Sequence, residues 1–190
     1  ISVTDVNDIT PVYQAADADD AISVNENVGT GSIDAGTITD TDTVGTYGCT
    51  LGGADAADFA CSISGSTVNI AFAADPNYES PADADTNNVY VVTVLIDDGV
   101  ADDANGATTL TITVADVNDI TPTYTATSTT PTVTEGATAV DSNVAITDAD
   151  TGDSNTCNLG GADAGSFTCT LSGQTAYSLA FSSAPDYENP

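Results

Sequence analysis

A short acidic segment that occurs twice is the part of the sequence best suited to chemistry. Residues 116–122 read Asp-Val-Asn-Asp-Ile-Thr-Pro, and residues 5–11 are identical to them. Two carboxylates and a carboxamide within four residues offer the oxygen ligands that hard cations such as Ca²⁺ prefer. The alternating run at 110–114 predicts a half-buried strand, and Pro122 favours an extended backbone before it. A strand running into a stiff, oxygen-rich segment suits a cation site between two domains.

The elements around this segment also recur along the chain. The only glutamates are Glu26, Glu79, Glu135 and Glu188, and they form two pairs with one spacing (135 − 26 = 109; 188 − 79 = 109). Three further segments recur with offsets close to this value, at 38–42 and 146–150, at 49–56 and 157–164, and at 77–79 and 186–188. A period this long predicts an array of domains rather than a solenoid, whose units are about 20–50 residues long.

Each copy contains short β-type runs separated by Gly, Asp, Asn and Pro. Residues 89–96 (VYVVTVLI) are the most apolar run and predict a central strand covered on both faces. About seven strands per copy predict an all-β fold of tandem antiparallel Greek-key β-sandwiches. We expect residues 1–11 to end a preceding repeat, 12–119 to form a complete repeat, and 120–190 to form a second repeat without its last two strands.

The composition excludes several classes of function. The chain has 190 residues, 29 acidic side chains and no Lys, Arg or His, which gives a net charge of −29. Nucleic acids and anionic membrane surfaces need basic side chains, so neither is an expected partner, and no membrane span is predicted. Acid–base catalysis would depend on carboxylates or tyrosines that belong to the cation elements, so we do not expect an enzyme. A solvated acidic surface is the alternative, but glutamates confined to repeated positions argue against it.

The cysteines form one pair in each copy, Cys49 with Cys61 and Cys157 with Cys169, each pair twelve residues apart. A zinc site is the competing interpretation, but two cysteines without His are too few for closed zinc coordination. A reactive thiol needs a nearby base or positive charge, which the sequence lacks. We therefore predict one disulfide within each copy and an oxidising compartment.

Taken together, these elements resemble cadherin-like repeats, particularly the bacterial type found in long surface proteins. Residues 24–27 (VNEN) correspond to the family's x-Glu-x element, 77–79 (NYE) to Asp-Arg-Glu, 116–122 to Asp-x-Asn-Asp-x-x-Pro, and 148–150 (DAD) to Asp-x-Asp. The resemblance implies calcium ions held by Glu26, Asn77, Glu79, Asp116, Asn118, Asp119, Asp148, Asp150 and the carbonyls of Val117 and Ile120. For a preceding junction it implies Asp5, Asn7, Asp8, Asp40, Asp42 and Asp97, and for a following one Glu135, Asp186 and Glu188.

The expected function is that of an extracellular or cell-surface structural and adhesive array, a calcium-rigidified rod or filament segment. Its expected partners are calcium ions and neighbouring repeats or like subunits, with O-linked glycan as a further option at the Thr-rich residues 125–134. The alternative is a glycan- or protein-recognition module, for which loop aromatics would be the signal. Residues 83–87 (DADTN) have the oxygen spacing of a calcium loop, but a solvated loop is the preferred interpretation.

Overall fold

The computed structural model describes residues 1–17, 20–42, 45–99, 107–152 and 154–189. The chain forms two compact units, Ile1–Val117 (unit 1) and Asn118–Pro190 (unit 2). The described residues are almost entirely strands and loops, which confirms the predicted all-β class. No helix in the described part is long and apolar enough to cross a membrane. The repeat limits expected from the sequence, 12–119 and 120–190, stay a prediction.

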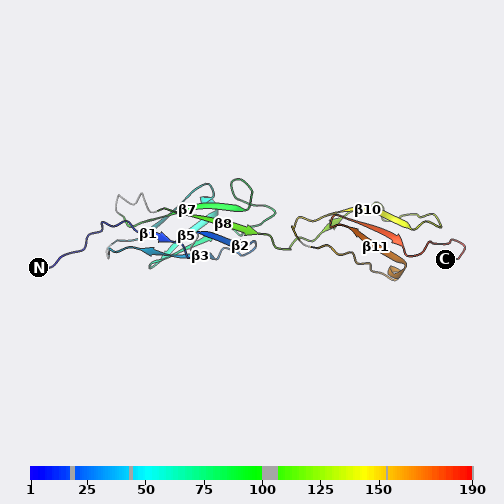
Figure 1. Cartoon of the computed structure of the whole chain (residues 1–190), viewed down its shortest axis with the longest axis horizontal. Helices are drawn as coiled ribbons and strands as arrows, with labels where there is room; N and C mark the ends of the chain where they lie inside the picture. Colours follow the sequence, from blue (N-terminus) through cyan, green and yellow to red (C-terminus); the bar gives the residue numbers. More distant parts are fainter. Residues whose placement is uncertain (18–19, 43–44, 100–106, 153, 190) are drawn as a thin grey trace. The chain divides into compact units, whose positions relative to one another are not determined.

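Unit 1 is a sandwich of two four-stranded sheets, with strand orders β1-β3-β6-β5 and β2-β8-β7-β4 (Figure 1). All neighbouring strands are antiparallel except β2 and β8, which run parallel. The described residues of unit 1 contain eight strands, where about seven were expected. Their bounds are β1 Val12–Gln14, β2 Ala21–Asn25, β3 Ser32–Thr39, β4 Gly48–Gly52, β5 Phe59–Ser64, β6 Thr67–Phe72, β7 Val89–Asp97 and β8 Thr108–Ala115, with a 3-10 turn η1 at Ala56–Asp58.

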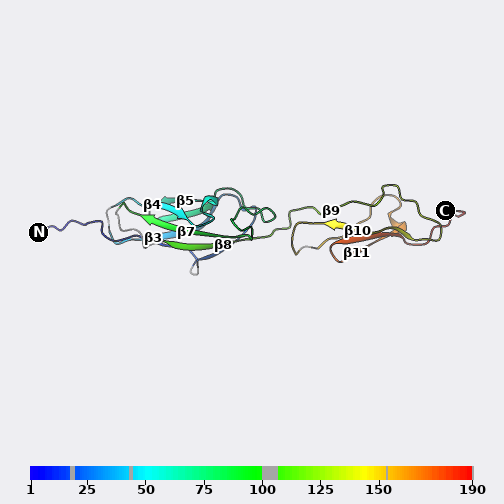
Figure 2. The same ribbon diagram turned by 90° about the horizontal axis from the view of Figure 1, so that it is seen from above.

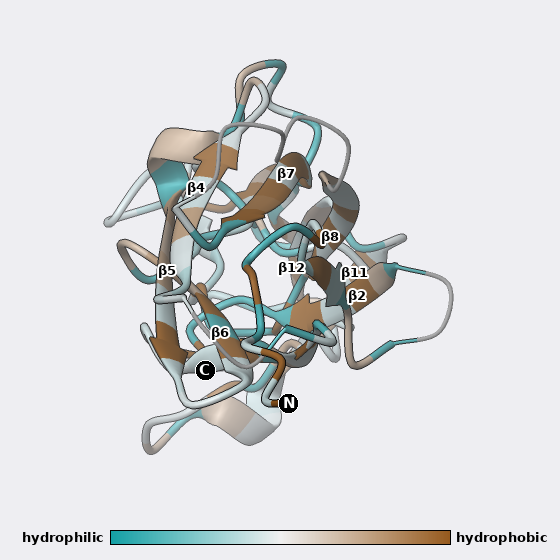
Figure 3. Cartoon of the chain, turned by 90° about the vertical axis from the view of Figure 1, so that its left-hand side faces the viewer, coloured by the Kyte–Doolittle hydropathy of each residue, from teal (hydrophilic) through white to brown (hydrophobic). Residues whose placement is uncertain are grey.

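Alternation along the strands builds the core of unit 1 from both sheets. In β6, Val68, Ile70 and Phe72 are at most 2 % exposed, and Tyr90, Val92, Val94 and Ile96 are buried at every second position of β7. Figure 3 shows hydrophobic residues on strands such as β7 and hydrophilic ones on many loops. The strand at residues 89–96 is central, as predicted, but only one face of it is fully buried, because Val91 on the other face is 41 % exposed.

Unit 2 consists of one sheet of order β11-β12-β10-β9 within its described residues. Few of its side chains are buried, and Val144 and Ala176 are its buried hydrophobic residues. Its aromatic pair Phe167–Phe181 repeats the geometry of Phe59–Phe72 in unit 1, with ring centroids 4.6 Å and 4.7 Å apart. The strands are β9 Thr123–Tyr124, β10 Ala139–Thr147, β11 Phe167–Ser172 and β12 Ala176–Phe181, with a 3-10 turn η3 at Ala164–Ser166.

Both predicted disulfides are present, Cys49–Cys61 and Cys157–Cys169, and neither pairs a cysteine of one unit with one of the other. In unit 1 the bond joins β4 of one sheet to β5 of the other, and Figure 2 shows these two strands side by side. It therefore links the two sheets of the sandwich at one edge.

A buried tyrosine–carboxylate pair fixes the first strand of unit 1. The Tyr13 hydroxyl donates a hydrogen bond to Asp34 Oδ2, and Asp34 Oδ1 accepts one from the Ala16 amide at 2.9 Å. Tyr13 and Asp34 are 2 % and 4 % exposed. Gly36 leaves room for the ring, since a Cβ there would lie 2.4 Å from it. Burial, and then the hydrogen bond and charge of Asp34, raise the pKa of Tyr13 strongly above its usual value of 10.0.

This pair predicts a loss of stability at alkaline pH. Above about pH 10 the unfolded chain releases the Tyr13 proton while the folded chain keeps it, so the stabilisation present below pH 10 declines as the pH rises. We expect the free energy of unfolding to fall more steeply in the native chain than in Tyr13→Phe, by up to about 1.4 kcal/mol per pH unit. Urea unfolding between pH 7 and 12 measures both slopes. Equal slopes would contradict this assignment.

Candidate metal centres

Parallel pairing of β2 and β8 brings acidic residues together at one end of unit 1. Because the two strands run in the same direction, the residues that follow them, Glu26 and Asp116, lie at the same edge of the sheet. The Glu26 amide donates to the Ala115 carbonyl at 3.0 Å, continuing the ladder by one residue. Glu79 joins this group, since its carboxylate lies within 4.8 Å of a carboxylate oxygen of Glu26 and of Asp116.

Backbone amides hold the Glu26 side chain at this edge. Its Oε1 accepts a hydrogen bond from the Val117 amide at 2.9 Å, and its Oε2 accepts one from the Tyr78 amide at 2.8 Å. Glu26 is 2 % exposed, although the chain has no Lys, Arg or His to neutralise it. Buried carboxylates this close repel one another unless a cation lies among them. Asn77 is exposed, and its Oδ1 accepts a hydrogen bond from the Ser80 amide at 2.7 Å. This oxygen is therefore less available to a cation than those of Glu26 and Glu79.

A second acidic group lies in unit 2, at the C-terminal end of β10. Asp148 is half-buried, and both of its carboxylate oxygens are buried with no hydrogen-bond partner in the described part of the chain. Asp150 is 7 % exposed; its Oδ2 accepts from the Ile120 amide at 2.8 Å, and its Oδ1 is buried and likewise unpartnered among the described residues. Asn118 and Asp119, the first residues of unit 2, are exposed. Carboxylate oxygens that are shielded from water and accept no hydrogen bond are suited to binding a cation.

The first residues of the chain take part in a third group, in unit 1. Asp42 Oδ2 accepts hydrogen bonds from the amides of Asp8 and Ile9, at 2.8 and 2.7 Å, as Asp150 does from Ile120 in unit 2. Asp40 Oδ1 accepts from the Asp42 amide at 3.0 Å. Asp5 is exposed. The predicted equivalence of residues 38–42 with 146–150 therefore holds in the contacts of the two units.

Asp98, which is not among the ligands predicted from the sequence, extends this third group. It is 4 % exposed, and its carbonyl accepts a hydrogen bond from Asn7 Nδ2 at 3.2 Å. Asp97, a ligand that the family resemblance implies, is exposed and accepts a hydrogen bond from the Gly99 amide. The alternation of buried and more exposed side chains along β7 indicates this burial from the sequence. The buried residues Tyr90, Val92, Val94 and Ile96 place residue 98 on the same face. Burial, and then a hydrogen bond to Asp40, raise the pKa of Tyr47 beside this group.

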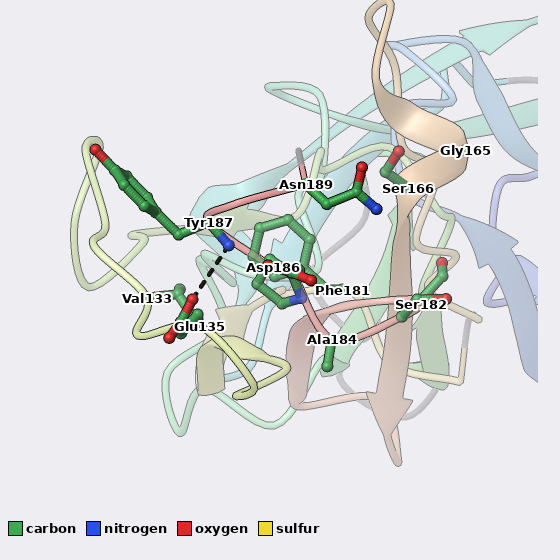
Figure 4. Close-up of a pocket in the computed structure, with 12 residues that line it drawn as sticks. Val133, Glu135, Gly165, Ser166, Phe181, Ser182, Ala184, Asp186, Tyr187 and Asn189 are labelled. Carbon is green, nitrogen blue, oxygen red and sulfur yellow. Dashed lines mark hydrogen bonds between the residues drawn. The ribbon is translucent and has the colours of Figure 1, made fainter.

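A fourth group stands at the far end of unit 2. Carboxylate oxygens of Glu135, Asp186 and Glu188 lie within 4.8 Å of one another, and all three residues are exposed. The Tyr187 amide donates to Glu135 Oε2 at 3.2 Å, as the Tyr78 amide does to Glu26 in unit 1 (Figure 4). The unit 2 group is thus the counterpart of the first one, but without the burial that encloses Glu26.

Two other buried aspartates are structural. Asp55 accepts hydrogen bonds from the amides of Ala84 and Val91, at 2.8 and 2.7 Å, and Asp83 accepts from the amides of Asn87 and Asn88, at 2.8 and 3.3 Å. Asp55 therefore fastens the loop before β7 and the start of β7 to the residues before η1, whereas Asp83 holds that loop together from within. The expectation of a solvated loop at residues 83–87 is therefore wrong for Asp83, which is 3 % exposed, and holds for the exposed Asp85.

Solved structures with the same fold are cadherin extracellular domains. Extracellular domains 3–6 of protocadherin gammaB7, solved as a cis-dimer, match with 21 % sequence identity and a TM-score of 0.61, over 97 % of this chain and 45 % of that one. Domains 22–24 of mouse cadherin-23 match with 20 % identity and a TM-score of 0.58, over 98 % of this chain and 58 % of that one. The chain therefore has a cadherin-like fold and spans about half the length of these structures. Comparison with protein-family models and with curated proteins finds no match.

Proposed function

We propose that this chain is a calcium-binding segment of an extracellular adhesive or structural array, in which bound ions stiffen the connection between consecutive domains. The observation that carries this proposal is Asp148, whose carboxylate oxygens are both buried without a hydrogen-bond donor in the described structure. The chain offers no side-chain cation to neutralise them. Oxygen-only ligands, with all described cysteines in disulfides, favour Ca²⁺ over softer metals.

The proposed ligands come from both sides of the connection. Unit 1 supplies Glu26, Asn77, Glu79 and Asp116, and unit 2 supplies Asn118, Asp119, Asp148 and Asp150. Val117 and Asn118 are consecutive residues, so the chain itself joins the two sets. Ions held by both sets would fix the backbone dihedral angles of the connecting residues. We propose two further sets of calcium ligands. The third acidic group supplies Asp5, Asn7, Asp8, Asp40, Asp42, Asp97 and Asp98. The fourth supplies Glu135, Asp186 and Glu188.

Two features support an extracellular or surface location. Both cysteine pairs are disulfide-bonded, and such bonds persist in oxidising compartments. The fold is shared with extracellular domains of cadherins, one of which was solved as a cis-dimer. We therefore propose like subunits or neighbouring repeats as protein partners.

A recognition module for glycan or protein is the second candidate. The observation in its favour is two exposed tyrosines of unit 2, Tyr124 at 66 % and Tyr187 at 84 %. Tyr124 already packs edge-on against Tyr177, with ring centroids 5.3 Å apart, which leaves Tyr187 as the ring available for stacking on a sugar. Glycan binding that Tyr187→Ala abolishes in the presence of a calcium chelator would favour this candidate.

Calorimetric titration with Ca²⁺ tests the proposal through matched variants. Asp148→Asn should weaken binding on the order of tenfold or more, because it removes one charge from a buried ligand. Asp163→Asn makes the same change at an exposed position of unit 2 and should have no effect. In the same way, Asp98→Asn and Asp97→Asn decide which residue serves the third group, and we expect the larger loss for Asp98. Equal affinities for Asp148→Asn and Asp163→Asn would remove the basis of the proposal.

A further inference from the structure

Unit 1 contains a cleft of about 200 Å³ whose lining includes only one of the proposed calcium ligands, Asn77. Phe72 at the end of β6 and Tyr90 in β7 line it; they are 2 % and 1 % exposed, and their ring centroids lie 5.4 Å apart. Small apolar residues line much of the rest, namely Ala57, Ala73, Ala74, Pro76 and Ala82. The cleft is smaller than the roughly 300–1,000 Å³ of pockets for drug-sized ligands, so it suits a single side chain.

Two carboxylates also line this cleft, Asp58 of η1 and Asp75 of the loop that follows β6. Asp75 is held in place by the Gly29 amide, which donates to its Oδ1 at 2.6 Å. Burial, and then the charges of Asp55 and Asp83, raise the pKa of Asp58 above its usual value of 3.8. The Asp58 carboxylate therefore stands among like charges, and the chain has no Lys, Arg or His to offset them. A cation from outside the chain would stabilise this arrangement.

Unit 2 shows that the fold does not require these carboxylates. The Ala73 amide donates to the Asp58 carbonyl at 2.8 Å, and in unit 2 the Ser182 amide donates to the Ser166 carbonyl at the same distance. The backbone is thus closed in the same way when serine replaces the aspartate of η1. The aspartate of the loop is likewise replaced, by Ala184, and Figure 4 shows both replacements. The two acidic side chains of unit 1 are therefore free to serve recognition.

We propose that this cleft binds the side chain of an exposed lysine on a partner protein. The unbranched stem of the lysine packs against the alanines and Phe72, and its ammonium group donates hydrogen bonds to Asp58 and Asp75. These 190 residues contain no lysine, so another copy of them cannot supply the contact. The site is additional to the proposed calcium function, and it selects a partner with a basic surface.

A pair of peptides tests the charge of the ligand. Each is a capped pentapeptide of alanines with one central residue, lysine in the first and acetyl-lysine in the second, so the stem is kept and the charge is removed. NMR titration of ¹⁵N-labelled native chain in saturating Ca²⁺, at about 0.15 M salt, suppresses long-range attraction to the net charge. The lysine peptide should shift the amides of Ala57, Asp58, Ala73 and Asp75, and the acetyl-lysine peptide should bind on the order of tenfold more weakly.

Matched variants test the two carboxylates. Asp58→Ser and Asp75→Ala introduce the residues of unit 2, so the fold should persist, and each should weaken binding of the lysine peptide about fivefold. The double variant should bind both peptides equally. Asp17→Asn removes one charge from an exposed position of unit 1 outside this cleft, and should bind the lysine peptide like the native chain.

The outcomes separate this inference from the calcium proposal, because every titration is made with the calcium groups occupied. Equal binding of the two peptides to the native chain overturns the inference, and so do equal losses in Asp58→Ser and Asp17→Asn, which would indicate attraction to the net charge alone. Displacement of the lysine peptide by additional Ca²⁺ would assign Asp58 and Asp75 to the metal and overturn it as well. None of these results changes the affinity of the chain for calcium at Asp148.

Discussion

Calcium should raise the unfolding temperature of both units, and a chelator should reverse the change. A ligand that binds only the folded state stabilises it by about 2.7 kcal/mol at a hundredfold excess over its Kd. For domains of this size, that energy corresponds to an increase on the order of 10–20 °C. The physical reason is the carboxylate groups, in which Glu26 and Asp150 are buried without a side-chain cation. Scanning calorimetry of the chain in Ca²⁺ and in chelator measures the shift.

Salt provides the necessary control, because a chain with a net charge of −29 is also stabilised by screening alone. Sodium chloride at equal ionic strength should produce only a small part of the calcium effect, and Mg²⁺ should act more weakly, since it requires near-ideal octahedral geometry. Glu26→Gln should reduce the calcium-dependent gain of unit 1, whose third acidic group it leaves intact. The control variant Asp163→Asn should show the same gain as the native chain. If sodium chloride reproduced the full shift, screening rather than site binding would explain the stability.

The repeated elements of the sequence predicted the all-β fold class, whereas the calcium ligands taken from them stay a prediction. The offsets between the copies placed Asp42 and Asp150 in equivalent positions, and the two residues accept the same kind of backbone hydrogen bonds in the structure. The equal cysteine spacings predicted both disulfides. These successes share one cause: a pattern that occurs twice at one period is much more specific than a single motif.

The errors arose where contacts distant in the sequence decide the outcome. Nothing local indicates that β2 and β8 run parallel, yet this pairing is what brings Glu26 to Asp116. The apolar run of β7 suggested two covered faces, but its position between β8 and β4 covers only one of them fully. Asp97 matches the motif of the family and stays a predicted ligand, although Asp98 is the buried residue of the two. The alternation of buried side chains that ends at Ile96 places residue 98 on the buried face.

Unit 2 shows how much a strand depends on its partner. In the described part of unit 1, β4 pairs only with β7 and β2 pairs only with β8. The corresponding segments of unit 2, residues 156–160 and 130–134, have strand-like sequences but form no strand. The described residues of unit 2 contain no strands equivalent to β7 and β8. The sequence of a segment therefore indicates its strand propensity, whereas the pairing decides whether the strand forms.

Removing the two disulfides should have different effects on local structure, although both bonds close loops of the same size. Cys49 lies in β4, which is also held in place by its pairing with β7. This pairing contains five residue pairs, from Gly48–Asp97 to Gly52–Thr93. Cys157 lies in a segment without strand pairing, and its bond to Cys169 ties that segment to β11. Replacing either pair by alanine should cost its unit about 3 kcal/mol, since the unfolded chain regains the entropy of an open loop.

Hydrogen exchange distinguishes the two cases within one molecule. In Cys49→Ala/Cys61→Ala, the amides of β4 should retain most of their protection, because the ladder with β7 persists. In Cys157→Ala/Cys169→Ala, residues 156–160 should exchange at rates close to those of an unstructured chain. Each variant serves as the control for the other, since the untouched unit should keep its native unfolding midpoint in urea. Loss of protection in β4 equal to that in residues 156–160 would show that the disulfide, and not the strand pairing, holds β4 in the sandwich.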